Sequence, residues 1–324
     1  MQTQQGLSEI VPELVQVNDE IESILQKGVK NHLGSSQPFF IDKRGKKLRP
    51  ALFLSSAKIH WQELTELIPL AASLELIHLA TLVHDDVVDN ATLRRNMPTV
   101  NATKGNKIAV LMGDYFFSKA FSLLTTVGNM EIINLLSRVV EEMSLGEIQQ
   151  QIDAFNADLT EEEYLQRIRQ KTAQFMASCC LAGCLTSEAP EDLKVTLYNY
   201  GLNLGMAFQI VDDVMDFKSD EFQTGKNNYS DLRNGVITLP LIYVLRTSPK
   251  SGLLRKSIQD KGPKTIEIER LLEEVEIDKG LAYALNVADQ HIEKAGFFAG
   301  QVPSKPVMET FQAITHLIFN RAKQ

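Results

Sequence analysis

Two groups of three aspartates are the residues of this sequence whose types and spacing could do chemistry. The segments "LVHDDVVD" (82–89) and "QIVDDVMD" (209–216) share the pattern DDxxD, and each lies in an otherwise apolar run. At about 3.6 residues per helical turn, the first and last aspartates of each group would lie one above the other. Unpaired charge is very costly inside a protein, so these carboxylates must face water, a cation or a metal.

The pair of motifs favours a metal. A single DDxxD on a helix is usually a solvated face or a cap, but both copies here are embedded in apolar sequence. Like charges one turn apart destabilise a helix unless something positive sits on them. Hard oxygen ligands suit Mg²⁺, which binds through one or two carboxylates plus substrate phosphates. Two such pairs of carboxylates, facing each other from two helices, would bind a diphosphate through bridging metal ions.

Basic residues near these motifs would complete a phosphate site. Guanidinium groups match phosphate oxygens bidentately, and lysine serves as a mobile point charge. The stretches "RGKKLRP", "TLRRNMPT", "RIRQKTAQF" and "TGKNN" supply the candidates, which are Lys46, Arg49, Arg94, Arg95, Lys171 with the adjacent Thr172, and Lys226.

Helices must position these residues. Apolar residues recur three and four apart in segments such as 12–29, 195–217 and 268–296, which predicts an all-α protein with about ten or more helices. Two stretches rich in turn-forming or basic residues, 38–50 and 218–235, are predicted to be loops. Loops on a rigid scaffold are where binding and catalytic residues are often placed.

Composition excludes several classes of protein. With 44% hydrophobic and 23% charged residues the chain is typical of a globular protein, and its formal charge of -8 argues against nucleic-acid binding. No linker or low-complexity segment divides the 324 residues, so a single domain over 1–324 is expected.

A cytoplasmic location without an integral membrane segment is expected. The N-terminal stretch does not resemble a signal peptide, and the longest apolar run, 68–83, is interrupted by Glu75 and His78 and is shorter than the roughly 20 residues of a membrane span. The three cysteines of "SCCLAGCLTS" predict a core patch rather than a zinc site, which fits a reducing compartment.

Seven ordered stretches then carry a family resemblance. "GKKLRP", "IHLATLVHDDVVDNATLRRNMPTVN", "GEIQQ", "KTAQF", "GMAFQIVDDVMDF", "GKNNYSDLRNG" and "ITLPLIY" resemble the motifs of the trans-isoprenyl diphosphate synthases, or polyprenyl synthetases, over about residues 40–245. The resemblance implies a single-domain all-α bundle around a deep apolar cavity, and a homodimer. It also implies isopentenyl diphosphate and an allylic diphosphate as substrates and Mg²⁺ as cofactor, with three ions per site.

The resemblance assigns roles residue by residue. The metal ligands are expected to be the six motif aspartates, Asp85, Asp86, Asp89, Asp212, Asp213 and Asp216. Isopentenyl diphosphate would be bound by Lys46, Arg49, His78 and Arg95, and the allylic diphosphate by Arg94, Lys171, Thr172, Gln209 and Lys226. The residues expected to take part in catalysis are Asp85, Asp86, Asp89, Arg94, Lys171, Asp212, Asp213 and Lys226.

The implied chemistry needs no side-chain nucleophile. Metal and basic groups would stabilise the departing pyrophosphate, so that the allylic C–O bond ionises. The double bond of isopentenyl diphosphate then attacks the cation, and a proton is lost to the pyrophosphate. His84, beside Asp85, is expected to support or pack rather than to act as a general base.

Three positions depart from the family pattern. Where this chain has Asn90 the family often has an acid, and where it has Val236 the family often has lysine. Residues 227–229 stand where the family often has Pro-x-Gly. The departures at 227–229 and 236 concern the loop after the second motif, and without lysine at 236, Lys226 would carry the pyrophosphate contact alone. Reduced turnover or a partner requirement would follow.

Three rival interpretations are weaker. A class I terpene cyclase usually carries an Asn/Ser/Glu pattern as its second metal motif, whereas this chain repeats aspartates. A non-catalytic partner subunit commonly lacks aspartates that are present here, although Val236 keeps this interpretation open. An HD-type phosphohydrolase needs further histidine ligands, and the remaining histidines show no supporting motif.

Product length can be predicted from the residues before the first motif. In the family, the side chains four and five positions before the motif form the floor of the product cavity, and here they are the small Thr81 and Ala80. A growing chain would pass on to Leu76 and Ile77 and then to Ser73. A geranylgeranyl or longer product is expected, with a long-chain polyprenyl diphosphate favoured.

The substitution Ala80→Phe is therefore expected to shorten the product, because the aromatic ring would close the cavity below the reacting carbons. Chromatographic sizing of the extracted products measures the change. An unaltered product distribution would show that the floor lies elsewhere.

Overall fold

The prediction of an all-α protein is confirmed. The structure is a computed structural model, and it describes residues 7–30, 47–61, 63–94, 96–218, 229–260 and 265–322, with only the backbone for 29–30, 218, 265–268 and 320–322. Within these ranges, β-structure is confined to one antiparallel pair, β1 (Leu93–Arg94) and β2 (Met97–Pro98), in which Leu93 pairs with Pro98. The pair forms a short hairpin after the first aspartate motif.

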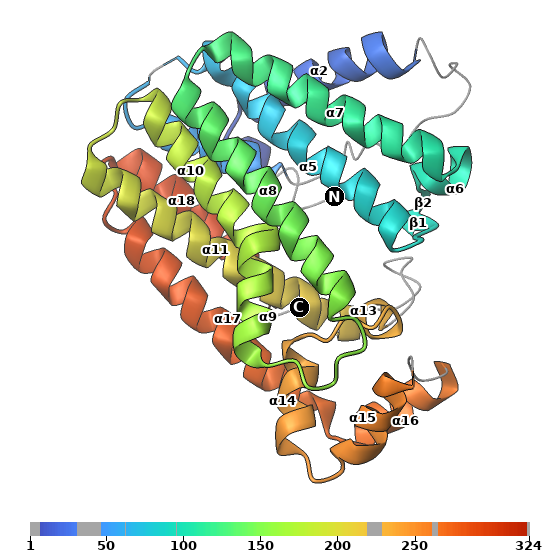
Figure 1. Cartoon of the computed structure of the whole chain (residues 1–324). Helices are drawn as coiled ribbons and strands as arrows, with labels where there is room; N and C mark the ends of the chain where they lie inside the picture. Colours follow the sequence, from blue (N-terminus) through green and yellow to red (C-terminus); the bar gives the residue numbers. More distant parts are fainter. Residues whose placement is uncertain are drawn as a thin grey trace.

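Within the described ranges the helices follow one another along the chain (Figure 1). In the first part they are α2 (Leu14–Leu25), η1 (Gln26–Lys30), α4 (Leu48–Ala57), η2 (Thr65–Leu67), α5 (Ile68–Val88), α6 (Val100–Lys104), α7 (Asn106–Val127) and α8 (Met130–Ile152). In the second part they are α9 (Glu161–Ile168), η3 (Arg169–Ala173), α10 (Gln174–Thr186), α11 (Glu191–Lys218), α13 (Ser230–Arg233), α14 (Leu239–Thr247), α15 (Ser251–Gln259), α16 (Thr265–Glu274), α17 (Ile277–Ala299) and α18 (Lys305–Ala322).

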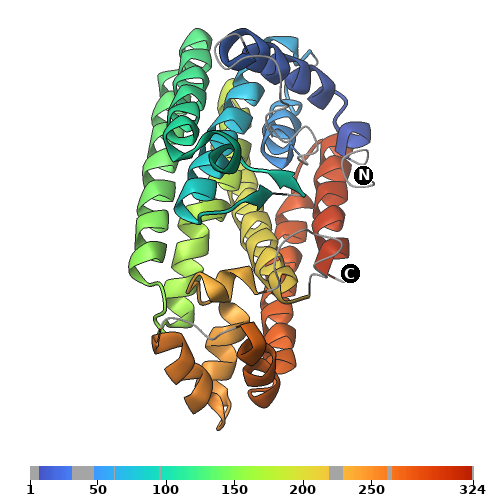
Figure 2. The same ribbon diagram turned by 90° about the vertical axis from the view of Figure 1, so that its right-hand side faces the viewer.

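The buried side chains form two hydrophobic clusters. One is built mainly from α2, α4, α5, α7, α8, α10 and α18, with the first half of α11. The other contains α9, α14, α15, α17 and the second half of α11. Because α11 runs through both clusters, it links the half of the molecule that carries α5 to the half that carries α14 and α17 (Figures 1 and 2).

Two glycines let α11 lie directly on the preceding helix. A Cβ atom added to Gly201 would lie 2.7 Å from the Met176 carbonyl oxygen, and one added to Gly205 would lie 2.5 Å from the Cα of Ala173. Since real Cβ atoms do not approach backbone atoms so closely, only glycine fits at these two contacts. The end of η3 and the start of α10 are thereby held against α11.

Local sequence signals explain several helix starts. Thr160 and Glu163 form a reciprocal capping box at the start of α9, and the Asn129 side chain accepts from two backbone N–H groups of α8. Pro69 and Pro240 occupy the first turns of α5 and α14, where a missing N–H costs least.

The two predicted loops are partly wrong. Of the first, residues 38–46 lie outside the described residues, but Leu48, Arg49 and Pro50 form the first turn of α4. Of the second, residues 219–228 lie outside the described residues, and Ser230–Arg233 form the short helix α13. Proline at the third position of α4 needs no backbone donor there, so a stretch ending in proline can still begin a helix.

The cysteine prediction is confirmed, because Cys179, Cys180 and Cys184 are free and buried in α10. The sequence predicted that no apolar stretch is long enough to span a membrane. This prediction is wrong, because two helices are long and apolar enough. Thr65–Val88 and Asn106–Val127 both qualify, since the first helix continues through Glu75 and His78. Of their most apolar windows, 72% of the first and 33% of the second is buried inside the protein. The first is thus a core helix, and the second shows apolar side chains at the surface.

Candidate active site

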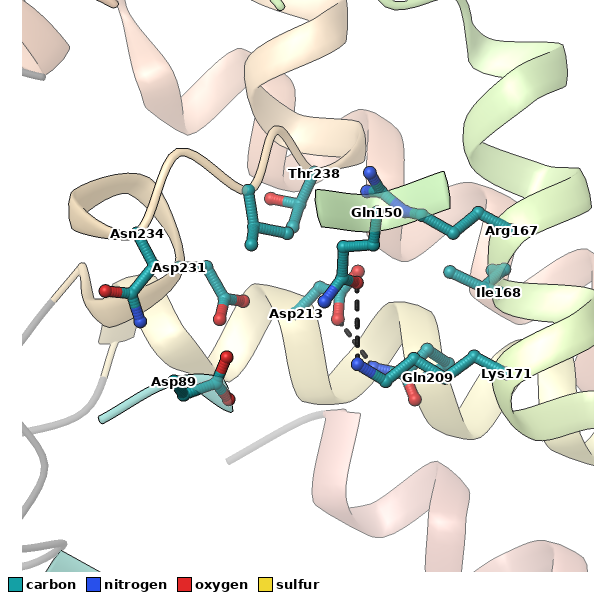
Figure 3. A pocket seen from close by; sticks show the side chains of 11 residues that line it. Asp89, Gln150, Arg167, Ile168, Lys171, Gln209, Asp213, Asp231, Asn234 and Thr238 are labelled. Carbon is teal, nitrogen blue, oxygen red and sulfur yellow. Dashed lines mark hydrogen bonds between the residues drawn. The ribbon is translucent and has the colours of Figure 1, made fainter. Parts of the chain in front are cut away.

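A polar pocket brings the two aspartate motifs together. Asp89 caps the C-terminal end of α5, and Asp213 lies in the second half of α11. Both line one open pocket of about 510 Å³, solvent space included, together with the cations Arg167 and Lys171 (Figure 3). Asp231, from the short helix α13, lies at the same opening.

Asp85 and Lys171 form the charged centre beside the first motif. The Lys171 ammonium lies 2.6 Å from Glu147 Oε2 and 3.5 Å from Gln150 Oε1. Burial raises the pKa of Asp85 to about 6, with further contributions from Glu147 and Asp89, while Lys171 and Arg94 oppose the rise. Burial lowers the pKa of Lys171, but Asp85 and Glu147 outweigh it, so the net pKa is raised. Lys171 therefore stays cationic among the acids.

Asp86 and Arg94 are paired with each other. Asp86 is buried, and its Oδ1 accepts from Arg94 Nε at 2.8 Å. Asn101 donates from its side chain to the Asp86 carbonyl at 3.1 Å, and to the Ala91 carbonyl at 2.9 Å. These contacts fasten the β1–β2 hairpin to the end of α5.

Asp213 is held by protein donors on both carboxylate oxygens. Tyr164 donates from its hydroxyl to Oδ2 at 2.7 Å, and Gln209 donates from Nε2 to Oδ1 at 2.8 Å. Gln209 in turn accepts from the Thr172 hydroxyl at 2.7 Å. Burial raises the pKa of Asp213 to about 6, with Asp212 adding to the rise, and the two hydrogen bonds oppose it. The chain Thr172–Gln209–Asp213–Tyr164 thus fixes the orientation of this carboxylate.

Asp216, near the C-terminal end of α11, binds the residues that begin α13. Its Oδ1 accepts from the Ser230 hydroxyl at 2.7 Å, and its Oδ2 accepts from the Asp231 backbone N–H at 3.1 Å. Its carbonyl accepts from the N–H of Tyr229, which has a positive φ of 62°. The third aspartate of the second motif therefore anchors α13 to α11.

A second group of basic residues lies between α4 and α5. Arg49 is buried with its guanidinium 4.9 Å from the centre of the Phe175 ring, and its Nε has no hydrogen-bond partner among the described residues. Burial, with Arg49, Lys47 and Arg94 nearby, holds the pKa of His78 well below its ordinary value. His78 is therefore a neutral imidazole next to cations.

Glu75 supplies the counter-charge for this basic group. Its carboxylate accepts from Lys47 at 3.0 Å, and both side chains are only 4% exposed. Lys47 precedes α4 with a left-handed backbone, at φ 52°, which costs a non-glycine residue roughly 1–2 kcal/mol. The buried ion pair holds this turn, from which Arg49 enters the core.

Comparison with known proteins identifies the chain. A family model described as polyprenyl synthetase matches residues 32–275. The chain belongs to the polyprenyl synthetase family. It is an enzyme of the prenyltransferase class.

Relatives and solved structures agree with this assignment. A prenyl transferase of Synechocystis sp. is 41% identical over 266 residues, covering 81% of each chain. Heptaprenyl diphosphate synthase component 2 of Geobacillus stearothermophilus is 35% identical over 285 residues, covering 87% of this chain and 88% of its own. The crystal structure of a polyprenyl synthase from Caulobacter crescentus, complexed with calcium and isoprenyl diphosphate, has a TM-score of 0.87 and 28% identity, covering 97% of each chain.

Several of the residues predicted for the polyprenyl synthetase site lie outside the described residues. They are Lys46, Arg95 and Lys226. Thr172 binds Gln209, Asp216 anchors α13, and Asp212 lies in α11 next to Asp213. The other predicted residues fall into three places. Asp85, Asp89, Lys171, Gln209 and Asp213 lie at or beside the pocket; Asp86 pairs with Arg94; and Arg49 lies with His78.

Some residues of this polyprenyl synthetase site were missed by sequence reasoning. Glu147 and Gln150 lie in the "GEIQQ" motif but were given no role there. Tyr164 and Arg167 precede Lys171 at intervals of three and four residues, which places them along one helical face. That spacing is the signal that would have found them. His84, by contrast, packs over Gly113 and lies 3.0 Å from the Val110 carbonyl, in agreement with a packing role.

The raised pKa of Asp85 gives a prediction for the metal-free polyprenyl synthetase. Because the folded pKa of about 6 exceeds the ordinary value of 3.8, the folded protein binds the proton more tightly, and stability is lost as pH rises from about 4 through 6. Asp85→Asn removes this cost. The midpoint of thermal unfolding at pH 7.5 is expected to rise by roughly 2–4 °C.

Calorimetry of Asp85→Asn and of the control Asp19→Asn, an exposed residue of α2, measures this effect. The dependence of the midpoint on pH between 4 and 6 is also expected to flatten in Asp85→Asn alone. An unfolding midpoint at or below that of the parent protein would contradict the desolvation of Asp85.

Proposed function

We propose that the chain is a Mg²⁺-dependent trans-prenyltransferase that condenses isopentenyl diphosphate with an allylic diphosphate, head to tail, and releases pyrophosphate. The observation that carries the proposal is the pocket shared by Asp89 and Asp213 with Lys171 and Arg167. Carboxylates from two helices would hold cations on a diphosphate, while the basic side chains would contact its oxygens directly.

The donor set fits magnesium. Within the described part of the chain, no three His, Cys, Asp or Glu side chains lie close enough to hold a metal ion by themselves. Mg²⁺ retains waters and commonly binds through one or two carboxylates plus substrate phosphates. A site with few protein ligands therefore suits it better than one in which the protein supplies every ligand. When bound, the ions would neutralise the charge that develops on the departing pyrophosphate.

The six aspartates would share this work. Asp213 and Asp216 already accept hydrogen bonds on both carboxylate oxygens, and Asp86 is paired with Arg94. All six are proposed as ligands for the ions, three of which are proposed per site. The contacts of Asp86, Asp213 and Asp216 would orient these three carboxylates.

The basic residues would divide the two substrates between them. Lys171, fixed by Glu147, would contact the allylic diphosphate, together with Thr172, Gln209, Arg94 and the undescribed Lys226. Isopentenyl diphosphate would lie near Arg49, whose buried Nε lacks a partner in the described part of the chain, and near the neutral His78, with Lys46 and Arg95 completing the site. After ionisation and attack, the pyrophosphate held by these cations would take the proton.

A long product is favoured by the apolar helix α5. Ala80, Leu76, Ile77 and Ser73 are fully buried and none is aromatic, so these positions of α5 place no ring below the motif. A geranylgeranyl or longer product is proposed, and a long-chain polyprenyl diphosphate is preferred. The deep apolar cavity that would hold it, the single domain over 1–324 and the cytoplasmic location remain proposals.

One incubation tests the proposed reaction. Purified protein with Mg²⁺, labelled isopentenyl diphosphate and farnesyl diphosphate is expected to give products that end at one long prenyl diphosphate, sized by chromatography. Asp85→Asn is expected to lower the rate by about 100-fold or more, since a charged ligand is lost, while Asp19→Asn leaves it unchanged. No extension with any allylic primer would refute the proposal and favour a subunit that needs a partner, as the name of the Geobacillus relative suggests for that protein.

A homodimer is proposed through α7 and α8. Leu145, Ile148 and Ile152 form a stripe on α8 at 54%, 56% and 70% exposure, and Leu111 on α7 is 63% exposed. Figure 2 shows both helices together along one edge of the molecule. Exposed apolar stripes of this kind mark association surfaces, and a second copy of the same stripe matches it in chemistry.

The double substitution Ile148→Glu with Ile152→Glu is expected to produce a monomer, because it places charges in the apolar stripe. Light scattering would then give the 36.3 kDa of one chain instead of about twice that mass. Leu253→Glu, at an equally exposed leucine of α15, is the control and should leave the mass unchanged. A doubly substituted protein that keeps the parent mass would place the interface elsewhere.

A further inference from the structure

Arg167 is a buried cation at the pocket with little protein compensation. It lies at the end of α9, is only 5% exposed, and its guanidinium carbon is 5.6 Å from the centre of the Tyr164 ring. Its NH2 group donates to the Ile237 carbonyl at 2.7 Å. Figure 3 shows the side chain reaching the pocket from the same helical segment as Lys171.

Asp213 lies near Arg167 but does not form an ion pair with it. Asp213 is close enough for the arginine charge to oppose the rise in its pKa, but both of its oxygens already accept from Tyr164 and Gln209. No described carboxylate lies within ion-pair distance of Arg167, whereas Lys171 has Glu147. A guanidinium has five N–H donors, and a buried charge is costly without an anion.

The surroundings of Arg167 favour an anionic ligand. Val236 lies in the same pocket, one residue before the carbonyl that orients the arginine, and contributes no charge. The helix widens into the π-helical turn η3 (Arg169–Ala173) two residues after Arg167, a distortion that is frequent at functional sites. Guanidinium groups bind phosphate oxygens through two parallel N–H donors.

We propose that Arg167 binds the diphosphate of the allylic substrate and of the pyrophosphate product, and that it supplies the cation that the Val236 side of the pocket lacks. The assignment rests on the proposed function for the identity of the ligand. The hydrogen bond to Ile237 and the Tyr164 ring hold the guanidinium in place, and the remaining N–H groups face the ligand. Arg167 and Lys171 would then contact one diphosphate from a single helical face.

A purely structural role is the competing explanation, in which Arg167 only supports the Ile237 carbonyl. The two roles differ in how they respond to a charge placed at residue 236. A lysine there would restore a cation to the same pocket, but its side chain would not replace the contact with the Ile237 carbonyl. Arg167→Gln removes the charge and retains an amide donor for that carbonyl.

Calorimetric titration with magnesium pyrophosphate measures the binding directly, without turnover. Arg167→Gln is expected to weaken binding about 10- to 100-fold, and Arg167→Lys is expected to retain most of it. Arg167→Gln combined with Val236→Lys is expected to recover at least about tenfold of the loss. The control Arg270→Met, at an exposed arginine of α16, should bind like the parent protein.

Steady-state kinetics give a second readout. Arg167→Gln is expected to raise the KM for the allylic substrate and to lower kcat, with little change in the KM for isopentenyl diphosphate. Parent-like pyrophosphate binding by Arg167→Gln would overturn the proposal. So would a double variant that unfolds at the parent temperature but binds no better than Arg167→Gln.

The proposed function fails in a distinguishable way. A parent protein that binds magnesium pyrophosphate through Arg167 but extends no primer would refute the reaction and support the ligand assignment. A parent protein that does not bind magnesium pyrophosphate would overturn both.

Discussion

The repulsion among carboxylates at the ends of two helices is the constraint on which the rest of the site depends. Asp85, Asp89 and Glu147 come close enough that Lys171 among them must stay protonated, and burial raises the pKa of Asp85 to about 6. The second motif meets the same problem differently, because Tyr164 and Gln209 satisfy the buried Asp213 by hydrogen bonding. Buried acids whose pKa values are raised in this way are typical of functional sites.

The family assignment and the geometry answer different questions. Membership in the polyprenyl synthetase family rests on a match over residues 32–275 and gives the class of enzyme. The geometry shows what orients three of the six aspartates, which the identical letters of the two motifs do not reveal. Asp86 pairs with Arg94, and Asp213 and Asp216 each accept hydrogen bonds on both carboxylate oxygens. It also separates Lys171, which has Glu147 as a partner, from Arg167, which has no paired acid among the described residues.

Much of the fold could be predicted from the sequence, because apolar residues three and four apart reported the helices directly. The spacing of Asp85 and Asp89 also placed them correctly one above the other at the end of α5. The partners could not be predicted in the same way. Glu75 meets Lys47 across 28 residues and Tyr164 meets Asp213 across 49, and no local pattern encodes such contacts. The first turn of α4 was mistaken for a loop because its basic residues and proline resemble one, whereas a buried ion pair fixes it.

The two aspartate motifs are supported by different hydrophobic clusters, so their relative position depends on how the clusters are joined. The first motif is carried by the cluster that contains α5, and Asp213 lies in the part of α11 that packs into the other cluster. The distance between the carboxylates of the two motifs therefore depends on how these two clusters pack against each other. Gly201 and Gly205 let α11 rest on the backbone of α10 and η3, and η3 carries Lys171 and Thr172. A methyl group added at either glycine would push α11 away from α10 and η3. It would thereby change the position of Asp213 relative to Lys171 without altering a charged residue.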